Sequence, residues 1–270
     1  MRKAIVFVAL LVGISLSVEI SLPLVWHAKG NLIRYVPRTD RYFTGGFLGA
    51  NVDFISVSLG KYAIILVPEA LIWTGMGYQC EEVIFDPRDM HYSLDAGIVF
   101  QQDKFRLKFT WYHDCFHEVD RKTEPTIIWN LFELALCPRN FSVQARLNEF
   151  QSEAGFDFKP KIYWQVYFGF FPKLSSPSWF QYKHDLATHF GAELNLSFAR
   201  FKKFSAEAGF YPEFWHNRKG KVYNRIIGRL SVNAYGYGGQ FSLFWSYIFS
   251  ETQPIRPKGR RAIIGVEFLM

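Results

Sequence analysis

Apolar and polar side chains alternate along most of this chain. Between positions 141 and 148 every odd position is apolar and every even position is polar. Closely similar alternation recurs at 204–211 and 222–235. A period of two residues is typical of a β-strand with one apolar face and one polar face. The pattern therefore predicts an all-β protein.

The alternating segments number about twelve, and turn signals separate them. Pro23 interrupts the first segment, which makes it the least regular of the set. An even number of antiparallel strands brings both ends of the wall to one side, as single-chain bacterial outer-membrane barrels require. We therefore predict a single transmembrane antiparallel up-and-down β-barrel of about 12 strands, at 19–35, 45–58, 62–75, 92–101, 104–115, 141–150, 161–172, 186–198, 204–213, 222–236, 239–249 and 260–270.

Connector lengths are consistent with this fold, because such barrels have short turns at one end and longer loops at the other. Short connectors at 60–61, 102–103, 199–203 and 237–238 alternate with longer ones, with 151–160 as an exception of medium length. The alternation requires 116–140 to be one outer loop. Within that loop we expect Thr126–Leu136 to form a short helix.

The N-terminal residues 1–17 have the features of a secretory signal peptide. Arg2 and Lys3 precede an apolar run, and Ser15 and Ser17 are small residues suited to cleavage before Val18. No later segment has the roughly twenty apolar residues of a spanning helix. We therefore expect a signal peptide at 1–17 and a barrel at 18–270, located in the bacterial cell outer membrane.

The two faces of each predicted strand are expected to contact different surroundings, lipid on one side and the barrel lumen on the other. In 186–198 the lipid-facing positions are the even ones from Leu186 to Phe198, and in 260–270 they are Ala262, Ile264, Val266 and Phe268. Buried charge is costly unless it is paired or hydrated, so a ladder of ion pairs with water is expected inside a narrow lumen. The lumen is predicted to hold charges of both signs, at Arg106, Lys108, Arg146, Glu193, Glu207, Arg225, Arg229, Arg261 and Glu267.

Composition narrows the classes of partner. The formal net charge is only +7, and the basic residues are spread along strands and turns, so nucleic acid is not an expected partner. An aromatic content of 19% suits a barrel, because Trp and Tyr settle at the boundary of hydrocarbon and water. The expected partners are the lipid bilayer and, through basic loops at 218–221 and 258–261, lipopolysaccharide phosphates. We expect a monomer.

Reactive side chains crowd together at the end of one predicted strand. The run from Trp111 to Arg121 contains His113, Cys115, His117 and Asp120. By parity, His113 and Cys115 lie on the lipid-facing side, near the outer rim. A His beside Cys115 could take its proton and generate a nucleophilic thiolate, with Asp114 or Asp120 orienting that His. These residues could equally bind neighbouring loops and headgroups without any chemistry.

This run resembles the His-x-Ser-Asn-Gly motif of outer-membrane phospholipase A, which lies on a twelve-stranded barrel. His113 matches the motif His, Cys115 stands where the family has Ser, and Phe116-His117 replaces Asn-Gly. Asn130 could stand for the family's orienting Asn. The pattern His113-x-Cys115-x-His117-x-x-Asp120 also resembles a His-x-Ser-Ser-His-x-x-Asp-Glu run in a family of uncharacterised bacterial envelope barrels.

Alternative chemistry remains open at this rim. We expect no cofactor. As alternatives, two His with Cys and Asp could hold zinc, and a phospholipase-like site could bind calcium, which prefers oxygen ligands. The three cysteines, Cys80, Cys115 and Cys137, all fall on the outer side in this topology. They allow at most one internal disulfide, and Cys115 could pair with either of the others.

We predict, first, a non-enzymatic channel or structural envelope protein with a narrow, charge-lined lumen, which needs no catalytic centre. Two further functions remain open as alternatives. The second is a lipid hydrolase that uses Cys115 with His113 or His117. The third is a soluble secreted β-barrel binder, in which the apolar strand faces would be enclosed by protein.

Overall fold

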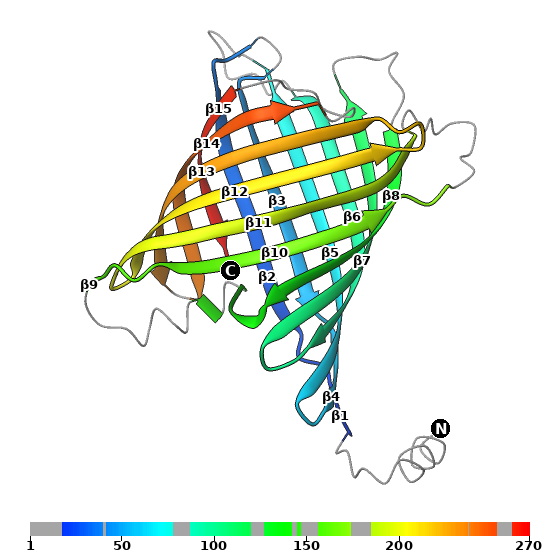
Figure 1. Ribbon diagram of the computed structural model, residues 1–270, viewed down its shortest axis with the longest axis vertical. Helices are drawn as coiled ribbons and strands as arrows, with labels where there is room; N and C mark the ends of the chain where they lie inside the picture. The colour runs from blue at the N-terminus through cyan, green and yellow to red at the C-terminus, as the bar shows by residue number, and fades with distance from the viewer. Residues whose placement is uncertain are drawn as a thin grey trace.

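The computed structural model describes residues 18–39, 42–77, 87–119, 127–141, 145–146, 156–173, 185–236, 238–252 and 261–270. Twelve strands form the wall of one barrel, and Figure 1 shows how they tilt around it. The predicted signal peptide at 1–17 lies outside the described residues. The wall strands are β2 (Val25–Val36), β3 (Thr44–Asp53), β5 (Tyr62–Met76), β6 (Pro87–Gln101), β7 (Phe105–Glu118), β8 (Ile127–Pro138), β10 (Lys161–Phe170), β11 (Leu186–Phe201), β12 (Phe204–Asn217), β13 (Val222–Gly236), β14 (Gly239–Glu251) and β15 (Arg261–Leu269).

Every wall strand pairs antiparallel with its neighbours in the chain, and β15 pairs with β2 to close the ring. The prediction of a twelve-stranded up-and-down barrel is confirmed. The C-terminus and the short hairpin turns lie at one end, which we call the turn end, and we call the opposite end the loop end (Figure 1). Gly60 and Gly238 have positive φ angles in two of the tight turns, where glycine adopts that conformation without strain.

Pro23 divides the first predicted segment as the sequence indicated. A short strand, β1 (Val18–Ser21), ends before the proline, and β2 begins at Val25. β1 leaves the ring and pairs with β4 (Ile55–Leu59), which forms a hairpin with the start of β5 beyond the turn end. The remaining short strand, β9 (Phe156–Asp157), pairs with the end of β11.

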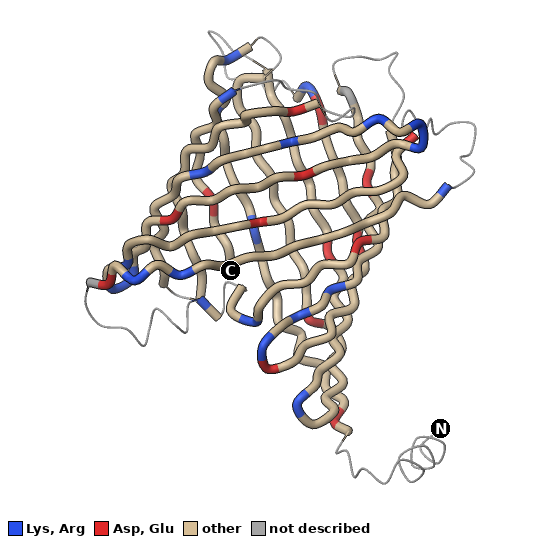
Figure 2. The backbone as a smooth tube through the Cα atoms, in the orientation of Figure 1, with Lys and Arg blue, Asp and Glu red and all other residues tan. Residues whose placement is uncertain are grey.

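Large apolar side chains cover the outer surface of the barrel. Leu194 and Val232 are 40% and 56% exposed, whereas Glu207 on the inner face is only 4% exposed. Figure 2 shows charged residues scattered along the wall strands rather than gathered on one side. In the described part of the chain, no helix is long and apolar enough to cross a membrane.

One predicted lipid-facing residue has the opposite orientation. Leu186 is 4% exposed and belongs to a buried cluster with Phe171 and Leu131. The cause is a register shift between Leu186 and Thr188 where β11 pairs with β12. A bulge adds one residue to one strand, so the parity of the residues on its far side is reversed.

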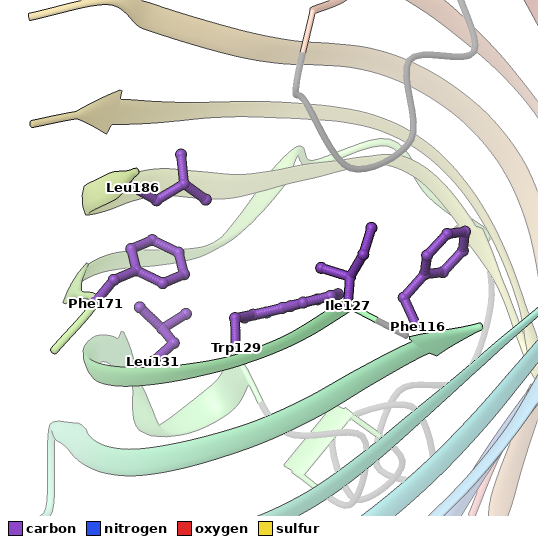
Figure 3. Packing of buried hydrophobic residues seen from close by; sticks show 6 residues of the cluster. All are labelled: Phe116, Ile127, Trp129, Leu131, Phe171 and Leu186. Carbon is purple, nitrogen blue, oxygen red and sulfur yellow. The ribbon is translucent and has the colours of Figure 1, made fainter. Parts of the chain in front are cut away.

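The largest correction concerns 116–140, which is not one outer loop. Residues 127–138 form wall strand β8, and the predicted helix at Thr126–Leu136 is wrong: its described part, 127–136, is strand. Ile127, Trp129 and Leu131 lie in an apolar cluster at the loop end, while Leu134 on the other face is 45% exposed (Figure 3). Because both faces are apolar there, the segment shows no alternation to reveal it.

The segment predicted as a strand at 141–150 is correspondingly not a wall strand in its described residues. Arg139–Phe141 form a short 3-10 helix, and Ala145 and Arg146 have helical backbone. β8 already pairs with β7 on one side and β10 on the other, so no strand edge remains for this segment. Arg146 is nevertheless buried against interior groups, Glu207 and Tyr163.

Candidate functional site

The outer faces of β7 and β8 carry the reactive residues that the sequence analysis singled out. The two strands pair so that His113 lies opposite Asn130 and Cys115 opposite Ile128. Odd-numbered residues of β7 point outward, as the exposure of Phe109 and Trp111 shows (43% and 41%). The pleat therefore puts His113 and Cys115 side by side on the outer surface, towards the loop end.

Three side chains form a continuous polar chain on this surface, which we call the outer-face triad: Cys115, His113 and Asn130. Cys115 Sγ lies 3.7 Å from His113 Nε2. On the other side of the same ring, His113 Nδ1 lies 3.0 Å from Asn130 Oδ1. A nucleophile, a base and an orienting group are thus connected in the order that acyl-transfer chemistry uses.

The hydrogen bond to Asn130 defines the tautomer of His113. An amide oxygen can only accept a hydrogen bond, so Nδ1 must carry the ring proton of the neutral imidazole. Nε2 then has a free lone pair directed at the Cys115 thiol. This is the arrangement in which a histidine can remove the proton of a nucleophile.

The other residues predicted at this rim have different surroundings. His117 packs edge-on against Tyr92, with 5.6 Å between the ring centroids. Asp114 points to the opposite face of β7, where it bonds to His91 at 2.7 Å. Asp120 lies outside the described residues. Of the two candidate bases, His113 contacts the thiol through Nε2 at 3.7 Å.

The cysteines are not gathered at one end as expected. Cys115 and Cys137 are both free thiols. Cys137 lies near the turn end, opposite Arg106 in the register of β7 and β8, and lines an interior cavity. The placement of all three cysteines on the outer side is therefore wrong for Cys137, because 127–138 is a wall strand that descends to the turn end. Cys80 lies outside the described residues.

Metal ligation finds little support in the part of the chain that the structure describes. No group of three or more His, Cys, Asp or Glu residues there is arranged to hold a metal ion. Tetrahedral zinc sites use three or four such protein ligands.

The barrel interior contains a cavity of about 670 Å³ in the half towards the loop end. Residues from the wall strands β2 to β13 line it, including Glu69, Asp95, Lys108, Glu133, Glu193 and Arg225. Glu69 is bonded by both Lys29 and Lys108. Arg225 pairs with Glu213 on the neighbouring strand. A second cavity of about 240 Å³ lies closer to the turn end and is lined by Arg106, Lys108 and Phe141, among others.

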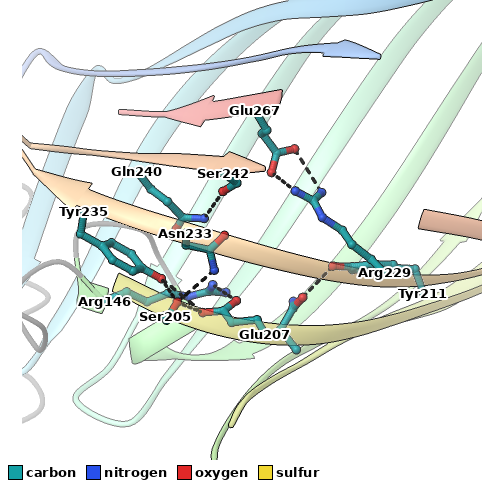
Figure 4. A network of polar contacts seen from close by, with 11 residues as sticks. Arg146, Ser205, Glu207, Tyr211, Arg229, Asn233, Tyr235, Gln240, Ser242 and Glu267 are labelled. Carbon is teal, nitrogen blue, oxygen red and sulfur yellow. Dashed lines mark hydrogen bonds and ion pairs between the residues drawn. The ribbon is translucent and has the colours of Figure 1, made fainter. Parts of the chain in front are cut away.

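A polar network occupies the turn-end half of the interior (Figure 4). Arg229 makes two hydrogen bonds to Glu267, the shorter at 2.7 Å, and lies over the ring of Phe244 at 3.9 Å. Arg146 lies 3.5 Å from Glu207 and stacks on Tyr163. Arg261, at the loop end, instead lies near the rings of Tyr35 and Tyr42.

Several interior groups were not singled out from the sequence. Glu133 lies 3.3 Å from His189, which stacks on Trp215 with 5.0 Å between ring centroids. Glu133 is the one charge in the apolar run 127–136, and that isolation was the signal that could have identified the run as a strand with an inner face. His189 carried no comparable signal, because it sits in an otherwise ordinary alternating segment.

No protein-family model and no curated protein matches this sequence. Among solved structures, the chain is similar to an outer-membrane channel from Pseudomonas putida F1, with a TM-score of 0.50, 11% identity and coverage of 92% of this chain and 96% of that chain. It is also similar to LpxR from Salmonella typhimurium, with a TM-score of 0.44, 11% identity and coverage of 90% and 99% respectively. These identities indicate a shared fold alone. The chain thus has the fold of bacterial outer-membrane β-barrels.

Proposed function

We propose that this protein is a hydrolase of lipid acyl esters that works on the outer surface of an outer-membrane barrel. The outer-face triad carries the proposal: Cys115, His113 and Asn130 connect at 3.7 and 3.0 Å on a surface surrounded by exposed apolar side chains. The contact between Asn130 and His113, which strand β8 provides, favours this function over a non-enzymatic role for the barrel.

The proposed reaction proceeds in two steps. His113 Nε2 accepts the thiol proton while Cys115 Sγ attacks the ester carbonyl carbon, so an S–C bond forms and the C–O ester bond breaks. The alcohol leaves with the proton held on Nε2. In the second step His113 removes a proton from water, which attacks the thioester, and the fatty acid leaves as the thiol is restored.

The surroundings of the triad favour a substrate with an acyl chain. Leu94, which lies opposite His113 on β6, is 63% exposed. Phe109 and Trp111 follow on the same face of β7. A hydrocarbon chain lying along this surface would bring its ester group to the level of the thiol. In the bacterial outer membrane, with the loop end outward, this level corresponds to the external leaflet, where lipopolysaccharide headgroups are a further partner.

The test is lipid hydrolysis by the purified protein in mixed micelles of phosphatidylethanolamine and detergent. Cys115→Ala and His113→Gln are each expected to lower the rate by at least about 1000-fold, since either change removes the nucleophile or its base. Cys137→Ala is the matched control and should retain full activity. Unchanged hydrolysis in Cys115→Ala would overturn the proposal. Running the same assay with calcium and with a chelator tests whether calcium contributes to the site.

A second candidate function is a cation-preferring passage through the lumen. The larger cavity is lined by five carboxylates, Glu69, Asp95, Asp114, Glu133 and Glu193, against three basic residues, Lys29, Lys108 and Arg225. Carboxylates in excess raise the local concentration of cations in a low-dielectric channel. Planar-bilayer recordings should then give a reversal potential that favours K⁺ over Cl⁻.

The Glu133→Gln/Glu193→Gln double variant should move that reversal potential towards zero, while Glu19→Gln, outside the ring on β1, should leave it in place. Absence of conductance for every ion tried would exclude this second function without bearing on the first.

A further inference from the structure

We propose that Trp111 is a positioning residue of the outer-face triad, which selects the orientation of the Asn130 amide and through it the tautomer of His113. This inference rests on the proposed function. The indole Nε1 of Trp111 lies 3.0 Å from Asn130 Oδ1, and His113 Nδ1 lies 3.0 Å from the same oxygen. One oxygen thus accepts from both rings.

The argument depends on which donors and acceptors each group has. An indole N–H can only donate, whereas an asparagine side chain has an acceptor at Oδ1 and donors at Nδ2. If the amide turned over, Nδ2 would face the indole, and two donors would oppose each other. Trp111 therefore disfavours the flipped amide, regardless of the state of His113.

The flipped amide would also disable the base. With Nδ2 facing the imidazole, Nδ1 would have to accept the hydrogen bond, and the single proton of the neutral ring would move to Nε2. That proton would point at Cys115, so the ring could no longer take the thiol proton. The residue that hydrogen-bonds to Nδ1 of a catalytic histidine strongly affects the reaction rate, because the wrong tautomer cannot accept the proton of the nucleophile.

The position of Trp111 suits this role. It is two residues before His113 on the same outward face of β7, and the ring centroids of the two side chains are 6.0 Å apart. The indole is 41% exposed on the outer surface, where water is scarce in a bilayer. From there it donates to the same Asn130 oxygen that accepts from His113, so the indole contact favours the amide orientation that the base requires.

The main test is Trp111→Phe, which keeps an aromatic ring and removes the N–H. We expect kcat to fall by about 10- to 100-fold with KM little changed, because the triad is misoriented while the acyl-binding surface remains. Trp245→Phe is the matched control: this indole is similarly exposed on β14, far from β7 in the strand order, and its loss should not change kcat.

Two double variants separate positioning from a structural effect. Trp111→Phe/Asn130→Ala should be no slower than Asn130→Ala alone, because Trp111 acts only through Asn130. Asn130→Asp replaces the amide by a group whose two oxygens both accept, so in that background Trp111→Phe should have no further effect. Additive losses in both pairs would overturn the inference.

The tautomer itself can be observed without any substrate. The ¹⁵N spectrum of histidine-labelled protein, assigned with the help of His113→Gln, should show protonated Nδ1 in the wild type and a substantial population of protonated Nε2 in Trp111→Phe. If Cys115→Ala shows that the proposed hydrolysis is wrong, this spectrum still decides the role of Trp111. An unchanged tautomer in Trp111→Phe would reject it.

Discussion

Arg229 illustrates how a charged side chain is accommodated inside this barrel. Its guanidinium bonds to both oxygens of Glu267, which lies two strands away on β15, and it lies over the ring of Phe244 on the intervening strand β14. Paired and stacked in this way, the guanidinium retains most of the contacts that water would have supplied. A bidentate arrangement also fixes its direction.

We expect Glu267→Gln to lower the free energy of unfolding by about 1–3 kcal/mol, because it leaves the Arg229 charge without its counter-ion. Urea titration of the barrel in lipid vesicles measures this change. The double variant Arg229→Gln/Glu267→Gln should recover much of the loss. If the double variant is as unstable as the two losses combined, the pair is not coupled.

The reactivity of Cys115 is a second property that belongs to single residues. With Cys80 and Cys137 changed to Ser, Cys115 should react with iodoacetamide faster in the wild-type context than in His113→Gln, by about tenfold at pH 7, because the imidazole takes the thiol proton. Mass spectrometry over a time course measures the rate. Equal rates would show that the 3.7 Å contact does not activate the thiol.

At the scale of elements, strand β8 is the piece on which both the wall and the triad depend. It pairs with β7 along its length and with β10 near its turn end. Its inner face supplies the apolar cluster at the loop end and Glu133, and its outer face supplies Asn130. A helix in an outer loop could not have presented these groups to two different surfaces.

Placing an arginine at Leu134 tests that assignment. Leu134 is 45% exposed on the outer face of β8, opposite Phe109 and Phe168 in the neighbouring strands. Leu134→Arg should lower the free energy of unfolding in lipid vesicles by about 2–4 kcal/mol, as charges near the bilayer midplane do. Val222→Arg, at the loop end of β13, should lower it by under about 1 kcal/mol. Equal costs at the two sites would contradict the wall position of Leu134.

At the scale of the whole molecule, closure of the ring by β15 and β2 gives every wall strand a neighbour on both sides. β15 is held by nine register pairs with β14 and eight with β2. Unpaired backbone groups are costly in hydrocarbon, so an open barrel is not a stable state there. The β1–β4–β5 extension lies outside the ring and does not contribute to closure.

Two deletions distinguish these parts. Removal of 261–270 should abolish the folded barrel, seen as loss of strand signal in circular dichroism and of resistance to SDS at room temperature, because two edges are exposed. Removal of Val18–Ser21 should leave both signals intact, since β1 pairs with β4 alone. A folded barrel without 261–270 would contradict the closed-ring account.

The sequence by itself determined the fold class, the approximate strand count and the outward direction of the apolar faces. These follow from local properties: a period of two, turn residues and the alternation of short and long connectors. It also brought His113 and Cys115 to one face, because residues two apart on a strand share a side. Leu194 and Val232 are exposed and Glu207 is buried, as the alternation predicts.

Only the tertiary structure decided which segments pair. The alternation at 141–148 and the mostly apolar run at 127–136 were both misleading, because strand pairing and packing in an apolar inner cluster are non-local and leave no period in the sequence. The pairing of β8 with β7 also brought Asn130 Oδ1 within 3.0 Å of both His113 and Trp111, which are 17 and 19 positions away in the sequence. The bulge that turns Leu186 inward likewise depends on pairing with β12.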